Sequence, residues 1–334
     1  MTTRKFDRII LCFIGGAVLA TATASIVSPN SGLTVAPRVS FDSARAEAIP
    51  LNQNARSSAS GGIESASRYD IESLRKVQDL AQGFKEIGYN LDGVRDDALV
   101  PRVFLAELPH DLNETAEVSL KKTVFFKMML PLILNENERI LADRNRLHQI
   151  KISMALGAKI EARDRLWLAV LAERYKLKDE NIDVLLRRVD IVPPSLAMAQ
   201  AAEESGWGTS RFARTANALY GQWTTSDGKG IIPEDRPEGM DHKVRAFDNL
   251  AQSVSAYMRN LNTHRAYREF RKHRKSIRGK GQALNGSVLA ENLTRYSERG
   301  KKYVDSVRAI INVNQLLGLD DAQLVKDDAD DQSV

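Results

Sequence analysis

Cysteine is almost absent from this chain of 334 residues, since Cys12 is the only one. It lies in an apolar run close to the N-terminus, too early in the chain for a lipid-attachment motif. A single cysteine excludes an intramolecular disulfide, and a chain shortened past it also lacks a thiol nucleophile and a cysteine-based metal site. Such a protein can fold outside the cytoplasm without oxidising machinery.

Histidine and long apolar runs are scarce as well. The histidines are not paired at the spacing of metal ligands, so we expect neither a metal site nor a cofactor. They are His110, His148, His242, His264 and His273. In the body of the chain, residues 124–134 are almost wholly apolar, but eleven residues interrupted by Lys127 are too few to cross a bilayer. This run predicts a buried core helix.

The N-terminus has the features of an export signal. Three basic residues within the first eight precede an apolar run at residues 9–18, and Ala-x-Ala sites follow within residues 20–24. This order predicts a secretory signal peptide over residues 1–24 and a location in the periplasm or cell envelope. The alternative is an uncleaved signal anchor, in which residues 9–27 tether the protein to the membrane.

Positive charge is in excess, with a formal net charge of +5. Much of it lies in residues 265–281, where eight Lys or Arg residues accompany one Glu. Such a run predicts a solvated helix face or a surface for an anionic partner. The export signal makes nucleic acid an unsuitable partner.

Composition divides the chain into five parts. A signal segment at 1–24 precedes a low-complexity linker at 25–68, rich in Ser, Ala, Asn, Pro and Gly. An N-terminal helical region at 69–160 and a second domain at 161–318 carry the periodic apolar patterns. The last part, 319–334, holds six Asp against one Lys and is expected to be a disordered acidic tail.

Helices account for most of the expected structure. Apolar residues recur at steps of three and four over residues 71–87, and this spacing predicts an amphipathic helix. A second helical region is predicted over residues 116–147, where Pro131 should kink or break it. Similar patterns continue at 163–177 and 181–189.

A small β-lobe interrupts the helices in the second domain. Pro194 lies at the start of a predicted helix over residues 195–205, and Gly206 should end it. Turn residues and β-branched residues then follow at 221–233, with an alternating segment at 242–247, which together predict a hairpin. Because helical patterns resume afterwards, the predicted fold is mainly α.

The stretch AAEESGWG at residues 201–208 carries the chemistry of greatest interest. A carboxyl near a helix C-terminus, shielded by apolar neighbours, has a raised pKa and suits a general acid. Trp207 next to it offers an aromatic face for a sugar ring, so the pair fits glycoside hydrolysis. Helical spacing puts both Glu203 and Glu204 on faces of small residues and does not choose between them. In the alternative interpretation both are surface residues and Trp207 fills the core.

A wider segment, QAAEESGWGTSRFARTANALYGQW at 200–223, contains a recurring motif. It resembles the motif of bacterial glucosaminidases with a mannosyl-glycoprotein endo-β-N-acetylglucosaminidase-like domain, in which a helix ends in Ala-x-Glu-Ser-x-Trp-Gly-x-Ser and an Asn-Leu-Phe-Gly segment follows. Residues 247–261 and 293–311 resemble the two later motifs of that family in the same order. The resemblance covers about residues 101–318 and is closest to the Bax subgroup.

This resemblance implies a lysozyme-like helical domain with a small β-hairpin lobe, preceded by an extra helical region. The residue before Ser-x-Trp in the family is the catalytic acid, which here is Glu204, whereas the position of Glu203 varies. Glu204 would protonate the oxygen of a β-1,4 bond after N-acetylglucosamine in peptidoglycan glycan strands. Tyr296 would lie beside the acid and assist water or the N-acetyl group. The candidate sugar contacts are Trp207, Tyr220, Trp223 and Asn217.

A second catalytic carboxylate is harder to assign. An inverting enzyme needs a base on the opposite face of the sugar, and the family draws candidates from the β-lobe. Here the lobe offers Glu234, Asp235, Glu238 and Asp241, and we favour Glu238 because it leads into the returning strand. The alternative is substrate-assisted chemistry through the 2-acetamido group, which needs no second carboxylate.

Two other functions share these features. A lytic transglycosylase acts on the same glycan with one essential Glu, and a non-catalytic wall-binding protein could dock through residues 265–281, because peptidoglycan peptides carry carboxylates. In each case we expect a monomer whose partner is the glycan.

Overall fold

The computed structural model describes residues 75–224, 230–232 and 243–326. The expected signal at 1–24 and the expected linker at 25–68 lie outside these residues. Within the described ranges, no helix combines the length and the apolar character needed to span a membrane.

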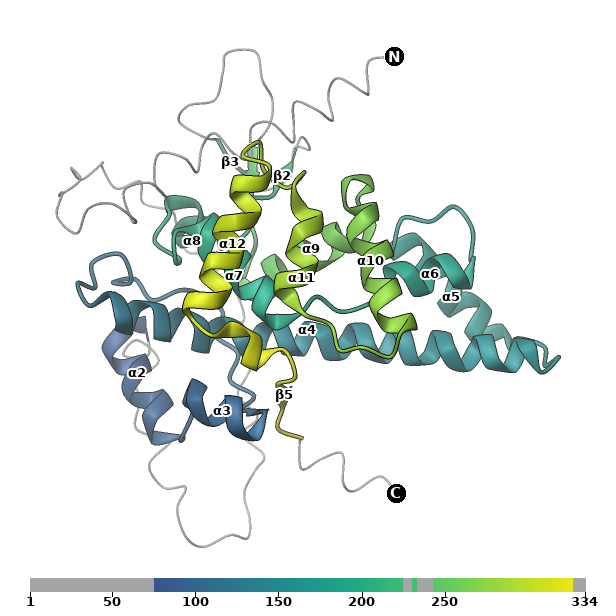
Figure 1. The fold of residues 1–334 in the computed structure, drawn as a ribbon, viewed down its shortest axis with the longest axis horizontal. Helices are drawn as coiled ribbons and strands as arrows, with labels where there is room; N and C mark the ends of the chain where they lie inside the picture. The colour runs from purple at the N-terminus through teal and green to yellow at the C-terminus, as the bar shows by residue number, and fades with distance from the viewer. Residues whose placement is uncertain (1–74, 225–229, 233–242, 327–334) are drawn as a thin grey trace, which may run out of the picture.

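The fold is mainly α with a small sheet, as expected for a lysozyme-like domain with a β-lobe (Figure 1). The described helices are α2 (Val77–Glu86), α3 (Leu91–Asp97), α4 (Val118–Ala155), α5 (Ala162–Arg174), α6 (Ile182–Arg188), α7 (Pro194–Ser205), α8 (Arg211–Ala216), α9 (Leu250–Thr263), α10 (Arg268–Gly279), α11 (Gly286–Ala290) and α12 (Lys301–Val313). Short 3₁₀ turns lie at Arg265–Tyr267, Glu291–Leu293 and Leu316–Leu319. The described strands are β1 (Leu99–Val100), β2 (Trp223–Thr224), β3 (Gly230–Ile231), β4 (Lys243–Arg245) and β5 (Gln323–Leu324).

The β-lobe is a three-stranded antiparallel sheet in the order β2-β4-β3. Trp223 pairs with Val244, and Gly230 pairs with Arg245, so β4 is the central strand. The sequence predicted a hairpin here, and the structure adds one more short strand. Part of the predicted turn-rich segment, residues 225–229 and 233, lies outside the described residues.

The C-terminal segment is folded further than its acidic composition suggested. β5 pairs in parallel with β1, where Val100 lies opposite Leu324. Asp320 accepts hydrogen bonds from the Ser195 backbone N–H (2.8 Å), the Ser195 hydroxyl (2.8 Å) and the Gly286 N–H (3.1 Å). The expected tail began at residue 319, but the folded part of the chain continues through residue 326.

Helix α4 runs without interruption through Pro131, so the expected break does not occur. Its 38 residues extend to Ala155, well past the predicted end at 147. A proline removes one backbone N–H and opposes the carbonyl four residues earlier. The residues around Pro131 are buried, and α4 packs against α2, α7 and α9, so tertiary packing outweighs the local preference.

Helix α7 lies at the centre of the molecule, and all twelve of its residues are buried. Pro194 is its first residue, and Gly206 ends it in the left-handed region with φ 58°, as the sequence predicted. Helices α4, α11 and α12 pack around it, and one hydrophobic core runs from Val77 to Leu324. The position of α7 therefore depends on elements from both ends of the chain.

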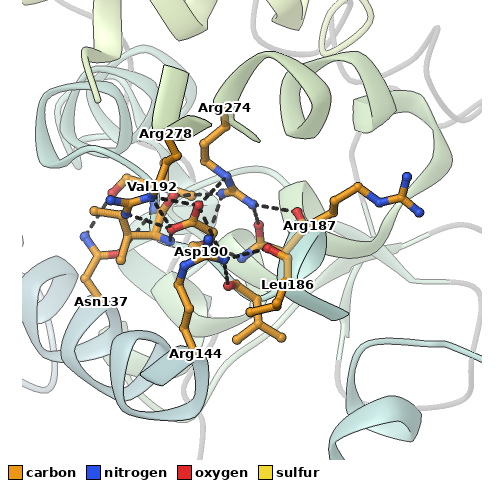
Figure 2. Close-up of polar contacts among 11 residues, drawn as sticks. Asn137, Arg144, Leu186, Arg187, Asp190, Val192, Arg274 and Arg278 are labelled. Carbon is orange, nitrogen blue, oxygen red and sulfur yellow. Dashed lines mark hydrogen bonds and ion pairs between the residues drawn. The ribbon is translucent and has the colours of Figure 1, made fainter. Parts of the chain in front are cut away.

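The segment entering α7 is held by a buried charge cluster centred on Asp190 (Figure 2). Its carboxylate lies 2.8 Å from Arg278 Nη2, 3.6 Å from Arg274 Nε and 3.7 Å from Arg144 Nη1. Burial raises the pKa of Asp190, but these guanidinium groups outweigh it and hold the pKa below the ordinary value. The Asn137 amide adds a bond of 2.9 Å to the Val192 carbonyl. The cluster joins α4 and α10 to the chain that leads into α7.

The basic segment at 265–281 is therefore only partly the solvated face that its composition suggested. Arg271 and Arg274 on α10 are buried, at 7% and 0% exposed. Arg271 donates to backbone carbonyls of Leu261 (2.8 Å) and His264 (2.9 Å). Part of this positive charge stabilises the fold and is not available to an outside partner.

We predict that Asp190→Asn destabilises the protein by about 3–5 kcal/mol, because three guanidinium groups lose the carboxylate that compensates them in a buried site. Urea denaturation at neutral pH measures the change. The control is Asp164→Asn, which removes a partly exposed pair with Arg146 (2.6 Å) and should cost below about 1 kcal/mol. Equal effects of the two substitutions would contradict the role given to Asp190.

Candidate active site

Glu204 lies in the last turn of α7 and is only 7% exposed. The Tyr303 hydroxyl is hydrogen-bonded to its carboxyl group. Among the described residues, its Oε1 atom has no hydrogen-bond partner. A buried carboxyl with an unused oxygen is costly as an anion and much less so when it carries a proton.

A chain of hydrogen bonds fixes the direction of the Tyr303 hydroxyl. Tyr257 Oη donates to Gln200 Oε1 (2.8 Å), and Gln200 Nε2 donates to Tyr303 Oη (2.7 Å). Because the Tyr303 oxygen already accepts from Gln200, its own hydrogen is left to donate to Glu204. The carboxyl is thus held by a donor whose orientation is set from within the core.

Five buried tyrosines lie around this carboxyl. Tyr220 stacks on Tyr257 with ring centroids 3.8 Å apart, and Tyr296 stacks on Tyr303 at 5.4 Å. Tyr267 lies 5.8 Å from Tyr296. Their rings exclude water from one side of Glu204. We call this set, Tyr220, Tyr257, Tyr267, Tyr296 and Tyr303, the tyrosine cage.

Burial raises the pKa of Glu204 to about 8. The next largest effect is the Tyr303 hydrogen bond, which lowers the pKa; the charge of Glu203 raises it and the charge of Arg299 lowers it by smaller amounts. At neutral pH the carboxyl is therefore mainly protonated. It can act as an acid, the role that the helix-end pattern suggested.

Glu203 is in a different environment although it is the adjacent residue. It forms an ion pair with Arg299, whose guanidinium also lies 5.4 Å from the Tyr303 ring centroid. The two carboxylates that looked equivalent by helical spacing are thus distinguished by their partners. The guanidinium of Arg299 compensates the charge of Glu203, whereas the partner of Glu204 is the uncharged Tyr303 hydroxyl.

Glu204 adjoins an open groove with a volume of about 590 Å³. Gly221 and Tyr296 line the groove, and a Cβ atom built on Gly221 would lie 3.8 Å from Glu204 Oε2. Gly221 has a φ of +57°, so the backbone favours glycine there, and the 3.8 Å distance places Glu204 in ordinary contact range of this position. The carboxyl thus lies behind the groove wall, next to Gly221.

One face of α9 lines the groove along the length of the helix. The residues that line it from α9 are Ala251, Gln252, Ser255, Ala256, Arg259, Asn260 and Thr263. A helix of 14 residues is about 21 Å long, so the groove can hold an extended polymer. Helix α4 contributes another part of the lining, with Leu132, Asn135, Glu136 and Arg139.

The structure brings together some of the residues that the sequence singled out. Tyr220, Trp223 and Tyr296 line the groove, and the Tyr296 hydroxyl donates to the Tyr220 carbonyl at 3.4 Å. Glu238, with the other acidic residues proposed from the β-lobe, lies outside the described residues. Tyr257 and Tyr303, from α9 and α12, are buried and belong to the tyrosine cage.

Trp207 and Asn217 are not among the described residues that line the groove. The Trp207 ring packs edge-on against Phe125 (6.2 Å) and Phe126 (5.2 Å) of α4. Asn217 ends α8 with φ 51°, and its side chain donates to the Phe247 carbonyl at 3.2 Å. Both side chains make contacts that support the structure around the site.

Two residues of the site were missed at the level of sequence. Tyr267 belongs to the cage but lies in the basic segment, where charge dominates the pattern. Glu136 follows the apolar run of α4, accepts from Ser255 Oγ (3.0 Å) and pairs with Arg139 (3.2 Å). Burial raises the pKa of Glu136, offset in part by Arg139 and the Ser255 bond. In the sequence, the only feature that could have indicated Glu136 is its position just after the apolar run of α4.

Comparison with known proteins identifies the family of the chain. Residues 180–316 match the family described as Mannosyl-glycoprotein endo-beta-N-acetylglucosaminidase. The chain is also 35% identical over 213 residues to Protein bax of Escherichia coli (strain K12), covering 62% of this chain and 74% of that protein. The chain belongs to the glucosaminidase family. No solved structure matches it. In this Bax-type member of the glucosaminidase family, α4 precedes the matched residues and yet supplies one wall of the groove.

We predict that Glu204→Gln stabilises the folded protein at neutral pH. The folded state keeps the Glu204 proton up to a pH of about 8, whereas the unfolded chain loses it near 4.5. Between these values the native state binds more protons, so its stability falls as pH rises. Glutamine removes this loss, which should raise stability by roughly 2–4 kcal/mol at pH 7.5 and leave it unchanged at pH 4.5.

Thermal melts of both proteins across this pH range measure the effect. Glu203→Gln is the matched control, and it should lower the melting temperature because Arg299 loses its partner. A Glu204→Gln protein that is less stable than the wild type at pH 7.5 would show that Glu204 is held as an anion.

Proposed function

We propose that the protein is a peptidoglycan hydrolase, an endo-β-N-acetylglucosaminidase that cleaves β-1,4 bonds with Glu204 as general acid. One observation carries this proposal: a carboxyl with a pKa of about 8 lies behind the wall of a long groove. The family membership of the chain supports a glycan as the substrate.

The proposed reaction begins with a proton transfer from Glu204 to the glycosidic oxygen as the bond to the anomeric carbon breaks. The carboxylate formed in this step keeps the hydrogen bond from Tyr303, and the charge of Arg299 stabilises it. Because the Tyr303 hydroxyl is already oriented by Gln200, little reorganisation accompanies the transfer. Water completes the hydrolysis, and its proton restores Glu204.

Trp223 is the proposed aromatic contact for a sugar ring, because it lines the groove. Tyr220 also lines the groove, but its ring is buried and stacked on Tyr257, so we propose that it supports the sugar site from within the cage. A groove about 21 Å long along α9 favours an internal cut in a polymer over release of a terminal unit. The attacking water could be activated by Glu238 or replaced by the substrate's own 2-acetamido group, with Tyr296 assisting either route.

Export through residues 1–24 to the periplasm or cell envelope, with residues 9–27 as an alternative membrane tether, is part of the same proposal. It rests on the sequence pattern of the N-terminus. We expect the protein to act there as a monomer on glycan strands.

We predict that Glu204→Gln lowers the rate of glycan cleavage by about 10²–10⁴-fold, the usual contribution of a general acid. Release of reducing ends from purified sacculi measures the rate. Glu203→Gln, the adjacent control, should retain activity within about tenfold, since Glu203 supports the site through Arg299. Wild-type activity should fall as the pH rises through about 8, because the acid loses its proton.

Mass spectrometry of the released muropeptides identifies the bond and the chemistry. Hydrolysis after N-acetylglucosamine leaves a reducing N-acetylglucosamine end, whereas a lytic transglycosylase leaves 1,6-anhydromuramic acid. Binding to sacculi without any cleavage would instead identify a wall-binding protein and contradict the enzymatic proposal.

A further inference from the structure

The groove carries an excess of positive charge that the fold does not compensate. Its described lining includes four cationic side chains and one carboxylate, that of Glu136. The cations are Arg139, Lys176, Arg245 and Arg259. They come from α4, from the turn after α5, from β4 and from α9, so separate elements converge on one charged surface.

These cations differ from the arginines of the Asp190 cluster, which all have a buried carboxylate partner. Arg139 pairs with Glu136 but remains 70% exposed, and Arg245 lies over the Phe247 ring at 4.9 Å. In the part of the chain that the structure describes, the side chains of Lys176 and Arg259 form no hydrogen bond or ion pair. Two charges that face the groove are therefore available to a ligand.

Their positions show that both act within the groove. The charge of Arg259 is one of those that lower the pKa of Glu136, and the charge of Lys176 contributes, after burial, to the lowered pKa of His264. Glu136 and His264 also line the groove. The amides of Asn135 and Asn260 lie on the same surface and can both donate and accept.

We propose that this surface binds the carboxylates of peptides attached to the glycan, so that the protein acts preferentially on peptide-bearing strands. This inference rests on the proposed function. Lys176 and Arg259 would contact the carboxylates, and Glu136 would accept hydrogen bonds from peptide N–H or ammonium groups. A phosphate polymer, the other anion of a cell wall, has no such donors and would be repelled by Glu136.

The test compares three substrates with the full chain: peptide-bearing glycan strands, the same strands with their peptides removed by an amidase, and strands whose peptide carboxylates are chemically amidated. The wild type should have a KM about fivefold lower on the first than on the other two, as expected for a few exposed ion pairs. The proposal would be overturned if all three substrates had equal KM values and a phosphate polymer inhibited cleavage by competing with them.

The variants are Arg259→Gln and Lys176→Gln, each of which should raise KM on peptide-bearing strands about threefold with little change in kcat. Lys275→Gln is the control, because Lys275 is exposed on α10 and is not part of the groove lining. It should leave KM unchanged. Salt at about 0.5 M should remove the preference, since it screens exposed charges within a few ångström.

The outcomes separate this inference from the proposed function. If no substrate is cleaved, the proposed function is wrong. If all three are cleaved with equal KM and the variants match Lys275→Gln, the function stands and the carboxylate-binding surface is wrong.

Discussion

The complete burial of α7 is the constraint on which the rest of the structure depends. A helix that lies wholly in the core cannot leave its polar groups to water, so each must find a partner or lose its charge. Glu203 is paired with Arg299, and Gln200 is bonded at both ends of its amide by Tyr257 and Tyr303. Glu204 has only a hydroxyl for a partner and is therefore held mainly as an acid. The chemistry of the site follows from where this helix lies.

Charge is distributed in two ways in this protein, and the contrast connects fold to function. Near Asp190, three arginines converge on one carboxylate and on backbone carbonyls, and they secure the chain that enters α7. In the groove, Lys176 and Arg259 face solvent without such partners among the described residues. Helix α4 contributes to both regions, through Arg144 and through Glu136. Helix α4, which precedes the residues matched to the family, thus helps to hold α7 in place and also lines the groove.

Much of the fold could be predicted from the sequence, because helix ends and turns depend on residues that are close together in the chain. Gly206 ended α7 as predicted, and the turn-rich region after it formed the small β-lobe. The length of α4 did not follow, since α4 packs against α7 and α9, which are distant in the chain. The burial of Arg274 could not be predicted from the sequence either, because Arg274 donates to the backbone carbonyl of Asp190, which lies 84 residues away in the chain. The match to the family motif singled out Glu204. The tyrosine cage could not be predicted in this way, because its residues come from five separate segments and no periodic pattern in the sequence indicates that they pack together.

The central claim is that the fold keeps Glu204 protonated at neutral pH. Its most direct test is an NMR titration of the full chain labelled with ¹³C at the glutamate carboxyl carbon, with the Glu204 signal assigned by its loss in Glu204→Gln. The account predicts that this signal titrates with a pKa of about 8, well separated from those of exposed glutamates. A Glu204 signal that titrates near 4.5, the ordinary value, would contradict it.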